Sequence, residues 1–437
     1  MEVQPHQAED KTTVTVLVTG ANSGLGFSIC CRLIDEFLFT RPQSQSLHLL
    51  FSTRDTKKGD STLRRLNAHL QKTLKEANAS TPGISLLLEA RIKLENVLVD
   101  LTRLLSVKAL AKQLLTRGQH LDAVVWNAGI AGWMGIDYLA AAREVLTSVV
   151  QATTYPHFMI CDVGALAKPQ LSGHGSVHTF PEPALGKVFT ANVFGHYMLT
   201  HWLAPLMDAG SRVVWVSSPS ALPEAFEVED LQGLGAKMAY ESSKRVTDLM
   251  VLTSEGEASR ESTRTFWGGR EEGPRPRMYV THPGVITTSI ADISWILTLG
   301  MIAITYLARW LGSPWHCVSA YKGAVSATYA VLAPPDQLPE LEEREGKGKW
   351  GSACDVFGHE RVARTEIEGW GYGGELGARP SGSVPYSRTG HKEATRESRE
   401  EFEETGRKVW REMEEMRVEW EKRLGKVEVD SASSVDA

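Results

Sequence analysis

A tyrosine and a lysine stand four positions apart in the segment Tyr240-Glu241-Ser242-Ser243-Lys244. If this segment is helical, both side chains leave the same face of the helix, one turn apart. A nearby ammonium group favours the phenolate, so we expect Lys244 to lower the pKa of Tyr240. Such a pair can move a proton to or from a carbonyl oxygen, although the same spacing also occurs by chance on surface helices.

The elements that must position this pair begin with a glycine-rich turn at residues 19–26, after an apolar run at 14–18 and before a helical pattern. Its glycines allow a tight turn and close approach of a pyrophosphate. The N-terminus of the helix offers unpaired N–H groups and a positive dipole end. The alternative is a plain turn. The pattern predicts dinucleotide binding by Gly20, Asn22, Ser23, Gly24, Leu25 and Gly26.

Residues 52–58 bear on which dinucleotide is bound, because they follow a strand predicted at 47–51, where the adenosine ribose should lie. An acidic residue there holds the 2′-hydroxyl of NAD, whereas an arginine accommodates the 2′-phosphate of NADP. Arg54, with Lys57 and Lys58 close behind it, favours NADP(H), and Thr53, Arg54 and Lys58 are predicted to bind the cofactor. Asp55 leaves NAD open.

The glycine spacing T-G-x-x-x-G-x-G, the segment Asn127-Ala128-Gly129, a strand that ends in Ser217-Ser218, and the Y-x-x-x-K pair together resemble the short-chain dehydrogenase/reductase family. The resemblance implies that Tyr240 hands its proton to a carbonyl oxygen as hydride arrives from the nicotinamide. It further implies that Ser218, the second serine of its pair, hydrogen-bonds that oxygen and that Lys244 also holds the ribose of the cofactor.

The same resemblance implies roles for residues at four other places. Asp100 matches the adenine-contacting position, unless it caps the helix expected near residue 106. Asn127 would lie beside the cofactor ribose. Asn192 matches the asparagine at a helix kink, whose side chain and backbone hold a water in the proton relay. The loop that closes over the nicotinamide carboxamide would contain Pro283, Gly284, Val285 and Thr287.

The order of the elements predicts an α/β fold with a Rossmann-like, doubly wound parallel sheet. We expect one domain at 12–335, with insertions at about 130–185, near the mouth of the active site, and 254–277, polar and exposed. A helix is also expected at 311–332. A charged extension should follow at 336–437, helical at about 397–424 and disordered at its end.

Composition narrows the function classes. The 437 residues carry a formal net charge of −6, which gives no reason to expect a nucleic-acid partner. Five cysteines without a C-x-x-C pair predict neither a disulfide framework nor a zinc site, and no other metal site is predicted. The first eleven residues are polar, so we expect no signal peptide and a cytosolic start.

Sixteen uncharged, mostly apolar residues at 293–308 fall short of the roughly 18 to 20 needed to span a bilayer. They predict a helix that lines an apolar substrate pocket, a helix that dips into a membrane face, or an ordinary buried helix.

Five blocks, at 190–197, 215–221, 240–245, 282–289 and 311–316, resemble the fungal 3-keto-steroid reductases of ergosterol synthesis, with likeness over about 12–335. This resemblance implies NADPH-dependent reduction of the 3-keto group of a C4-demethylated sterol to the 3β-alcohol. It also implies a peripheral place at the cytosolic face of the endoplasmic reticulum and at lipid droplets, within a C4-demethylation complex. The residues alone indicate carbonyl/alcohol redox chemistry, so another bulky ketone, or a non-catalytic cofactor-binding scaffold, stays open.

Overall fold

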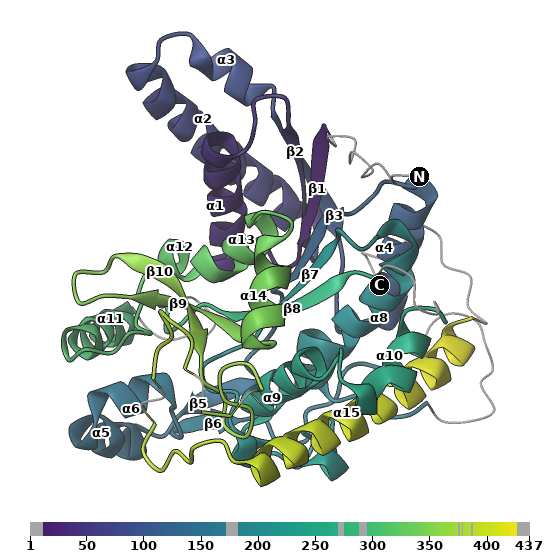
Figure 1. The fold of residues 1–437 in the computed structure, drawn as a ribbon, viewed down its shortest axis with the longest axis vertical. Coiled ribbons are helices and arrows are strands. Elements are labelled where there is room, and N and C mark those ends of the chain that lie inside the picture. The colour runs from purple at the N-terminus through teal and green to yellow at the C-terminus, as the bar shows by residue number, and fades with distance from the viewer. Residues whose placement is uncertain are drawn as a thin grey trace, which may run out of the picture.

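The short apolar runs predicted as strands, together with two strands that were not predicted, β9 and β10, form one eight-stranded sheet with the order β10-β9-β8-β7-β4-β1-β2-β3 (Figure 1). The computed structural model describes residues 12–171, 182–269, 275–287, 295–374, 376–377, 379–385 and 388–425. All neighbouring strands are parallel except the antiparallel pair β9 and β10. The strands are β1 Thr13–Val18, β2 Ser46–Thr53, β3 Ile92–Leu98, β4 Ala123–Trp126, β7 Arg212–Val216, β8 Arg277–His282, β9 Lys349–Cys354 and β10 Glu360–Thr365.

Strand order reverses between β1 and β4, which pair in the middle of the sheet. From β1 the chain proceeds outward to β2 and β3, and it then returns to β4 and continues to β7 and β8 on the other side. Such a switch point leaves a crevice beyond the carboxyl ends of the strands, where dinucleotides bind in open α/β sheets. The predicted Rossmann-like, doubly wound arrangement is confirmed.

Alternation along the strands divides the core between the two faces of the sheet. On β1, Leu17 belongs to one hydrophobic cluster, and Val16 and Val18 belong to the other. The cluster with Leu17 includes α4 Leu104–Arg117, α8 Gly195–Leu203 and α9 Ala239–Leu252. The opposite cluster includes α1 Gly24–Thr40, α2 Thr56–Ser80 and α13 Val325–Leu332. Helices therefore cover both faces.

The remaining elements lie around this core. They are α3 Ile84–Glu89, β5 Trp133–Ile136, α5 Tyr138–Thr147, α6 Val149–Thr154, β6 Met159–Cys161, α7 Lys187–Phe189, η1 Thr190–Phe194, η2 Ala204–Leu206, η3 Pro223–Ala225, η4 Val228–Asp230, η5 Glu257–Ser259, α10 Arg260–Phe266, α11 Trp295–Trp310, α12 Ala320–Gly323, α14 Gln337–Glu345 and α15 Arg396–Leu424. The helix expected at 311–332 is thus confined to α12 and α13, because 311–319 is not helical.

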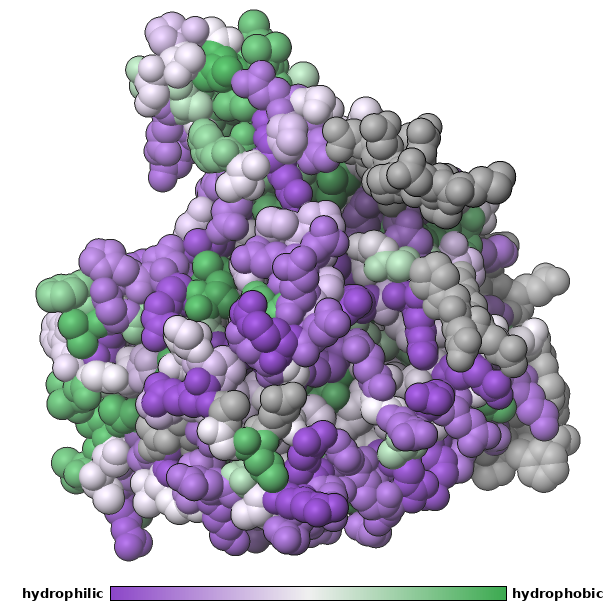
Figure 2. All heavy atoms as spheres, in the orientation of Figure 1, coloured by the Kyte–Doolittle hydropathy of each residue, from purple (hydrophilic) through white to green (hydrophobic). Residues whose placement is uncertain are grey.

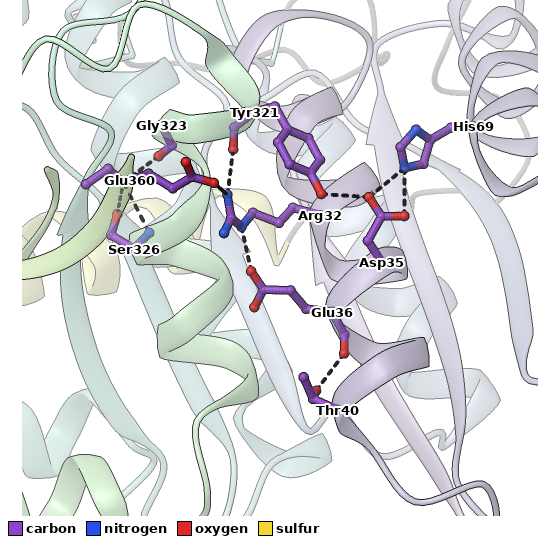
Figure 3. Close-up of polar contacts among 10 residues, drawn as sticks. Arg32, Asp35, Glu36, Thr40, His69, Tyr321, Gly323, Ser326 and Glu360 are labelled. Carbon is purple, nitrogen blue, oxygen red and sulfur yellow. Dashed lines mark hydrogen bonds and ion pairs between the residues drawn. The ribbon is translucent and has the colours of Figure 1, made fainter. Parts of the chain in front are cut away.

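A polar network fixes the glycine-turn helix α1 against its neighbours (Figure 3). Arg32 donates to Glu36 at 2.5 Å and to Glu360 of β10 at 3.0 Å. Three residues further on, Asp35 accepts from the Tyr321 hydroxyl at 2.7 Å and contacts His69 Nε2 at 3.0 Å. Helix α1 is therefore tied to α2, α12 and the edge strand β10.

The sheet continues beyond the predicted division at residues 335 and 336, because β9 pairs with β8 and β10 pairs with β9. Helix α15, predicted at about 397–424, packs against α9 and α10, with Trp410 and Trp420 buried (Figure 1). Residues after 335 therefore belong to the body of the fold and do not form an appended segment. The predicted disordered end, 426–437, lies outside the described residues.

The two predicted insertions differ in character. The first holds the antiparallel pair β5 and β6 with α5 and α6, and its residues 172–181 lie outside the described ones. In the second, expected to be polar and exposed, Phe266 and Trp267 are buried and join the core cluster. The expectation that the second insertion is exposed was wrong, because its two aromatic residues pack into the core although most of the segment is polar.

Candidate active site

A cavity of about 560 Å³ opens at the carboxyl ends of β1, β4, β7 and β8. Sixteen of the predicted site residues line it: Gly20, Asn22, Ser23, Gly24, Leu25, Gly26, Thr53, Arg54, Asp100, Asn127, Ser218, Tyr240, Lys244, Pro283, Gly284 and Val285. Three others, Lys58, Asn192 and Thr287, are not part of its wall. Residues from seven separate stretches of sequence therefore meet at one crevice.

The glycine turn fits a phosphate group. Gly20 and Gly24 have positive φ angles of 69° and 55°, which glycine adopts without strain. A Cβ on Gly26 would lie 2.3 Å from the backbone oxygen of Gly20. Ser23, at the N-cap of α1, makes no side-chain capping hydrogen bond, so the first N–H groups of the helix face the cavity uncapped by this residue.

Arg54 and Asp55 take different roles at the end of β2. Arg54 is exposed and lines the cavity. Asp55 instead caps α2, where its Oδ1 accepts from the backbone N–H of Lys58 at 2.8 Å. The Lys58 ammonium lies 3.2 Å from Asp55 Oδ2. The Lys58 ammonium thus pairs with the carboxylate that caps α2, and Lys58 is not part of the cavity wall.

Asp100, which follows β3, and Asn127, which follows β4, form another part of the cavity wall. Asp100 Oδ1 accepts from the backbone N–H and the hydroxyl of Thr102, at 2.9 and 2.7 Å. The alternative that Asp100 caps the next helix is not observed, since α4 has Arg103 at its N-cap. Asn127 Nδ2 donates to the backbone oxygen of Thr19 at 3.0 Å, so it braces the glycine turn from β4.

Tyr240 and Lys244 lie one turn apart on α9, with the Lys244 ammonium 5.5 Å from the centre of the tyrosine ring. Lys244 Nζ donates to the backbone oxygen of Val216 at 2.7 Å. Burial lowers the pKa of Lys244 to about 8. Burial, followed by the charge of Glu241, raises the pKa of Tyr240 to about 12. The expected lowering of the Tyr240 pKa was wrong for this arrangement, and the phenol keeps its proton near neutral pH.

Ser218 lies beside Tyr240, and its hydrogen bond partly offsets the rise in the tyrosine pKa. Ser218 Oγ is 2.9 Å from Ser220 Oγ and accepts from the backbone N–H of Ser220 at 3.2 Å. Ser220 also lines the cavity. Sequence reasoning missed Ser220, although a second hydroxyl two residues after Ser218 was a visible signal.

Asn192 occurs in the π-helical segment η1, at the predicted kink. Its Oδ1 accepts from the backbone N–H of Ile130 at 2.8 Å, and its Nδ2 donates to the Ile130 oxygen and to Ser243 Oγ, both at 3.0 Å. The resemblance gave this side chain a part in holding a water. In the structure it joins the loop after β4 to α9.

The loop after β8 is pinned to residues 315–318. The backbone N–H of Val285 donates to the oxygen of Trp315 at 2.7 Å, and Val318 donates back to Val285 at 3.1 Å. Thr287 directs its hydroxyl to the Val318 oxygen at 2.9 Å. Pro283, Gly284 and Val285 therefore reach the cavity, and Thr287 anchors the loop.

Curated relatives match nearly the whole chain, although no family model matches it. The 3-keto-steroid reductase erg27 of Aspergillus fumigatus is 40% identical over 96% of this chain and 97% of that protein. The corresponding protein of Gibberella zeae is 36% identical over 94% of each, and that of Schizosaccharomyces pombe is 31% identical over 80% of this chain and 90% of that one. This chain belongs to the 3-keto-steroid reductases of the short-chain dehydrogenase/reductase family.

In this reductase the first insertion forms part of the cavity mouth, as expected from the sequence. Trp133 of β5 meets Tyr240 edge-on, with ring centres 5.7 Å apart. Thr153, Thr154 and Pro156 line the cavity from α6 and the residues after it. The buried Nε1 of Trp133 has no hydrogen-bond partner among the described residues. Sequence reasoning missed Trp133 because its segment carries no recognisable pattern.

Glu241, next to Tyr240, also lines the cavity of the reductase and was not predicted as a site residue. Burial raises its pKa to about 7. Its Oε2 is buried without a hydrogen-bond partner in the described part of the chain. A carboxyl group that titrates near neutrality therefore lies one residue from the proposed acid.

Proposed function

We propose that this chain reduces the 3-keto group of a C4-demethylated sterol intermediate of ergosterol synthesis to the 3β-alcohol, with NADPH. The observation that carries the proposal is the meeting of Ser218, Tyr240 and Lys244 in one cavity with the glycine turn. The relatives named as 3-keto-steroid reductases, aligned over up to 96% of the chain, support the substrate class.

The protein's own groups supply the proton chemistry. When bound, a nicotinamide dinucleotide supplies the hydride. Tyr240, whose pKa is raised to about 12, donates its proton to the carbonyl oxygen that becomes the alcohol. Ser218, oriented by Ser220, hydrogen-bonds that oxygen. The Lys244 cation beside the ring stabilises the phenolate that forms.

Preference for NADPH is supported by the residues after β2. Arg54 provides a cation on the cavity wall, where a 2′-phosphate would lie. Asp55, the residue that could have favoured NAD, turns its carboxylate into the N-terminus of α2. The nearest acid is therefore engaged in capping and does not compete for the ribose.

A peripheral position at a lipid surface is supported by exposed apolar side chains near the cavity mouth. Leu299 and Trp310 of α11 are 58% and 67% exposed, and Leu139 and Leu146 of α5 are exposed as well. Figure 2 shows apolar side chains gathered along the left edge, where Figure 1 places α11 and α5.

Helix α11 packs against α6, and none of its residues is part of the cavity wall among the described residues. This placement favours the membrane-facing interpretation of 293–308 over a pocket lining. No helix in the described ranges is both long and apolar enough to cross a bilayer. We therefore propose peripheral attachment at the cytosolic face of the endoplasmic reticulum and at lipid droplets, where partners of a C4-demethylation complex would meet the enzyme.

The substrate is tested with purified full-length protein, NADPH and a panel of ketones. The panel contains 3-keto sterols with and without C4 methyl groups and unrelated bulky ketones matched for size. We expect the highest kcat/KM for the C4-demethylated 3-keto sterols and a 3β-alcohol product. Preference for the unrelated ketones would overturn the sterol assignment.

A further inference from the structure

A buried lysine of β9, the strand next to the sheet edge, reaches the back of the active site. Lys349, the first residue of β9, donates through Nζ to the backbone oxygen of Ser218 at 2.7 Å. The same Nζ lies 2.6 Å from Oδ2 of Asp248. The side chains of Lys349 and Asp248 are 3% and 1% exposed. The contact therefore lies in the protein interior, where charges are screened little.

Asp248 continues the face of α9 that carries the proposed chemistry. Tyr240, Lys244 and Asp248 follow one another at intervals of four residues, so their side chains leave the same face of the helix. Lys349 meets this face from β9 and at the same time holds the Ser218 backbone. The ion pair between Lys349 and Asp248 therefore contacts both helix α9, which carries Tyr240, and the residues after β7, which include Ser218.

Stability alone is a weak reason for such a pair. Removing two charges from water costs several kcal/mol per ion, and the attraction between them repays this cost only in good geometry. Lys349 has that geometry, with two short contacts. Asp248 is less well satisfied, because its Oδ1 is buried without a hydrogen-bond partner among the described residues. We propose that Lys349 and Asp248 are positioning residues: Lys349 orients Ser218 toward the carbonyl oxygen, and Asp248, one turn after Lys244 on the same face of α9, holds Lys349 in place so that the two opposite charges of the pair face Lys244.

Titratable groups near Lys244 come from several elements. Asp248 on α9 and Lys349 on β9 are the charges that act on it, the Tyr240 ring lies 5.5 Å from its ammonium, and His196 of α8 is close enough to interact with it. His282 of β8 lies near Lys349. Burial lowers the pKa of His196 to about 3 and that of His282 well below its ordinary value, so both rings are neutral at working pH. Asp248 raises the pKa of Lys244 and Lys349 lowers it, against the larger effect of burial.

Asp248 and Lys349 shift the pKa of Lys244 in opposite directions, so variants of the two residues distinguish the proposed role from a purely structural one. Asp248→Asn removes the negative charge of Asp248, so the pKa of Lys244 should fall. In a plot of kcat against pH, the alkaline limb should then move to lower pH. Lys349→Met removes the competing cation, so the limb should move to higher pH. Each shift is expected at about one unit. The double variant Asp248→Asn/Lys349→Met removes both charges, and its limb should return toward that of the wild type.

Loss of the Ser218 contact gives a second readout. Lys349→Met should lower kcat about tenfold or more, whereas NADPH affinity, measured by fluorescence titration, should stay within about twofold. Asp248→Asn keeps the contact between Lys349 and Ser218, so its loss of kcat should be smaller. A pH titration of the lysine signals by NMR, with the Lys244 signal assigned through Lys244→Arg, should show the same opposite shifts without turnover.

Lys347→Met is the matched control. Lys347 is a half-buried lysine two residues earlier, and it pairs with Glu255 at 2.5 Å and Glu342 at 3.8 Å, away from the active site. This variant should lose stability while keeping the wild-type pH limb and kcat. The proposal is overturned if the folded Asp248 and Lys349 variants leave the limb unchanged or move it in the same direction, or if Lys347→Met reproduces their effects.

The inference rests on the proposed carbonyl reduction, but the two can fail separately. Any ketone that the wild type reduces serves for the kinetic comparison, and the NMR titration needs no substrate. A wild type that reduces no 3-keto sterol would therefore count against the substrate assignment, whereas unshifted variants would count against the ion pair.

Discussion

The Asp55 carboxylate points into the first turn of α2, where Oδ1 accepts from the backbone N–H of Lys58 at 2.8 Å, whereas the preceding residue, Arg54, lines the cavity. Capping of this kind stabilises the first turn of a helix. It also fixes the direction of the acid that would otherwise compete for a ribose. Arg54, and not this acid, therefore faces the cavity at the end of β2, which supports the proposed preference for NADPH.

Arg54→Ala should weaken NADPH binding by about 10- to 100-fold, because a hydrogen bond to a charged group contributes roughly 1.5–3 kcal/mol. NADH affinity should change little, since it lacks the 2′-phosphate. Fluorescence titration with both nucleotides measures the difference. Lys57→Ala is the control, because Lys57 is a neighbouring exposed cation outside the cavity wall. Equal losses for NADPH and NADH would contradict the assigned role of Arg54.

Tyr240→Phe should keep NADPH binding and lose reduction by about 10²- to 10⁴-fold, the range that a positioned general acid contributes. The ring contact with Trp133 is preserved in this variant, so folding should be unaffected. Stopped-flow absorbance of NADPH follows the chemical step. Tyr138→Phe, at an exposed tyrosine of α5, serves as the control. Undiminished turnover in Tyr240→Phe would remove the proposed acid.

Gly26→Ala should abolish cofactor binding, because its Cβ would lie 2.3 Å from the Gly20 oxygen and 2.5 Å from Asn127 Nδ2. The Gly20 oxygen belongs to the turn, and Asn127 braces the turn from β4, so neither atom can retreat without opening the turn. Gly300→Ala is the control: a Cβ there meets nothing within 4 Å, and an alanine in a helix is more favourable than glycine by about 0.5–1 kcal/mol. Differential scanning fluorimetry with and without NADPH separates binding from folding, and NADPH-dependent stabilisation of Gly26→Ala would contradict the prediction.

Local spacing was sufficient to predict the glycine turn, the Tyr240 and Lys244 pair and the doubly wound order. It could not show side-chain direction, so it left open whether Asp55 faces a ribose, whereas the structure shows this carboxylate capping α2. Contacts far apart in the chain were also invisible. Lys349 reaches Ser218 across 131 positions. Strands β9 and β10 were missed because charged neighbours mask their short apolar pattern.

The pair of His69 and Asp35 should make stability depend on pH (Figure 3). The hydrogen bond to Asp35 is the main cause that raises the pKa of His69 to about 10, above its ordinary 6.5. The stabilisation is therefore fully present below pH 6.5 and is lost as pH rises toward 10. Because the ring is only half-buried, we expect about 1 kcal/mol after solvent screening.

His69→Ala should consequently reduce the free energy of unfolding more at pH 6 than at pH 10, measured by urea titration. His157→Ala, at an exposed histidine of the first insertion, is the control. A loss in His69→Ala that is the same at both pH values would show that packing, and not the charge on the ring, accounts for the effect.

Attachment to a lipid surface predicts that charge on α11 prevents membrane binding. Leu299→Glu/Trp310→Glu should release the protein from liposomes in a flotation assay. Each substitution replaces an apolar side chain that the membrane would bury with a charge that is costly to remove from water. Leu86→Glu/Leu87→Glu on α3 is the matched control, since these leucines are equally exposed but lie at the far end of the α2–α3 arm (Figure 1). Turnover of a detergent-solubilised ketone should be unchanged in both variants, because neither pair lines the cavity. Release by the α3 variant alone would move the attachment site to that arm, and binding retained by both would contradict a membrane role for α11.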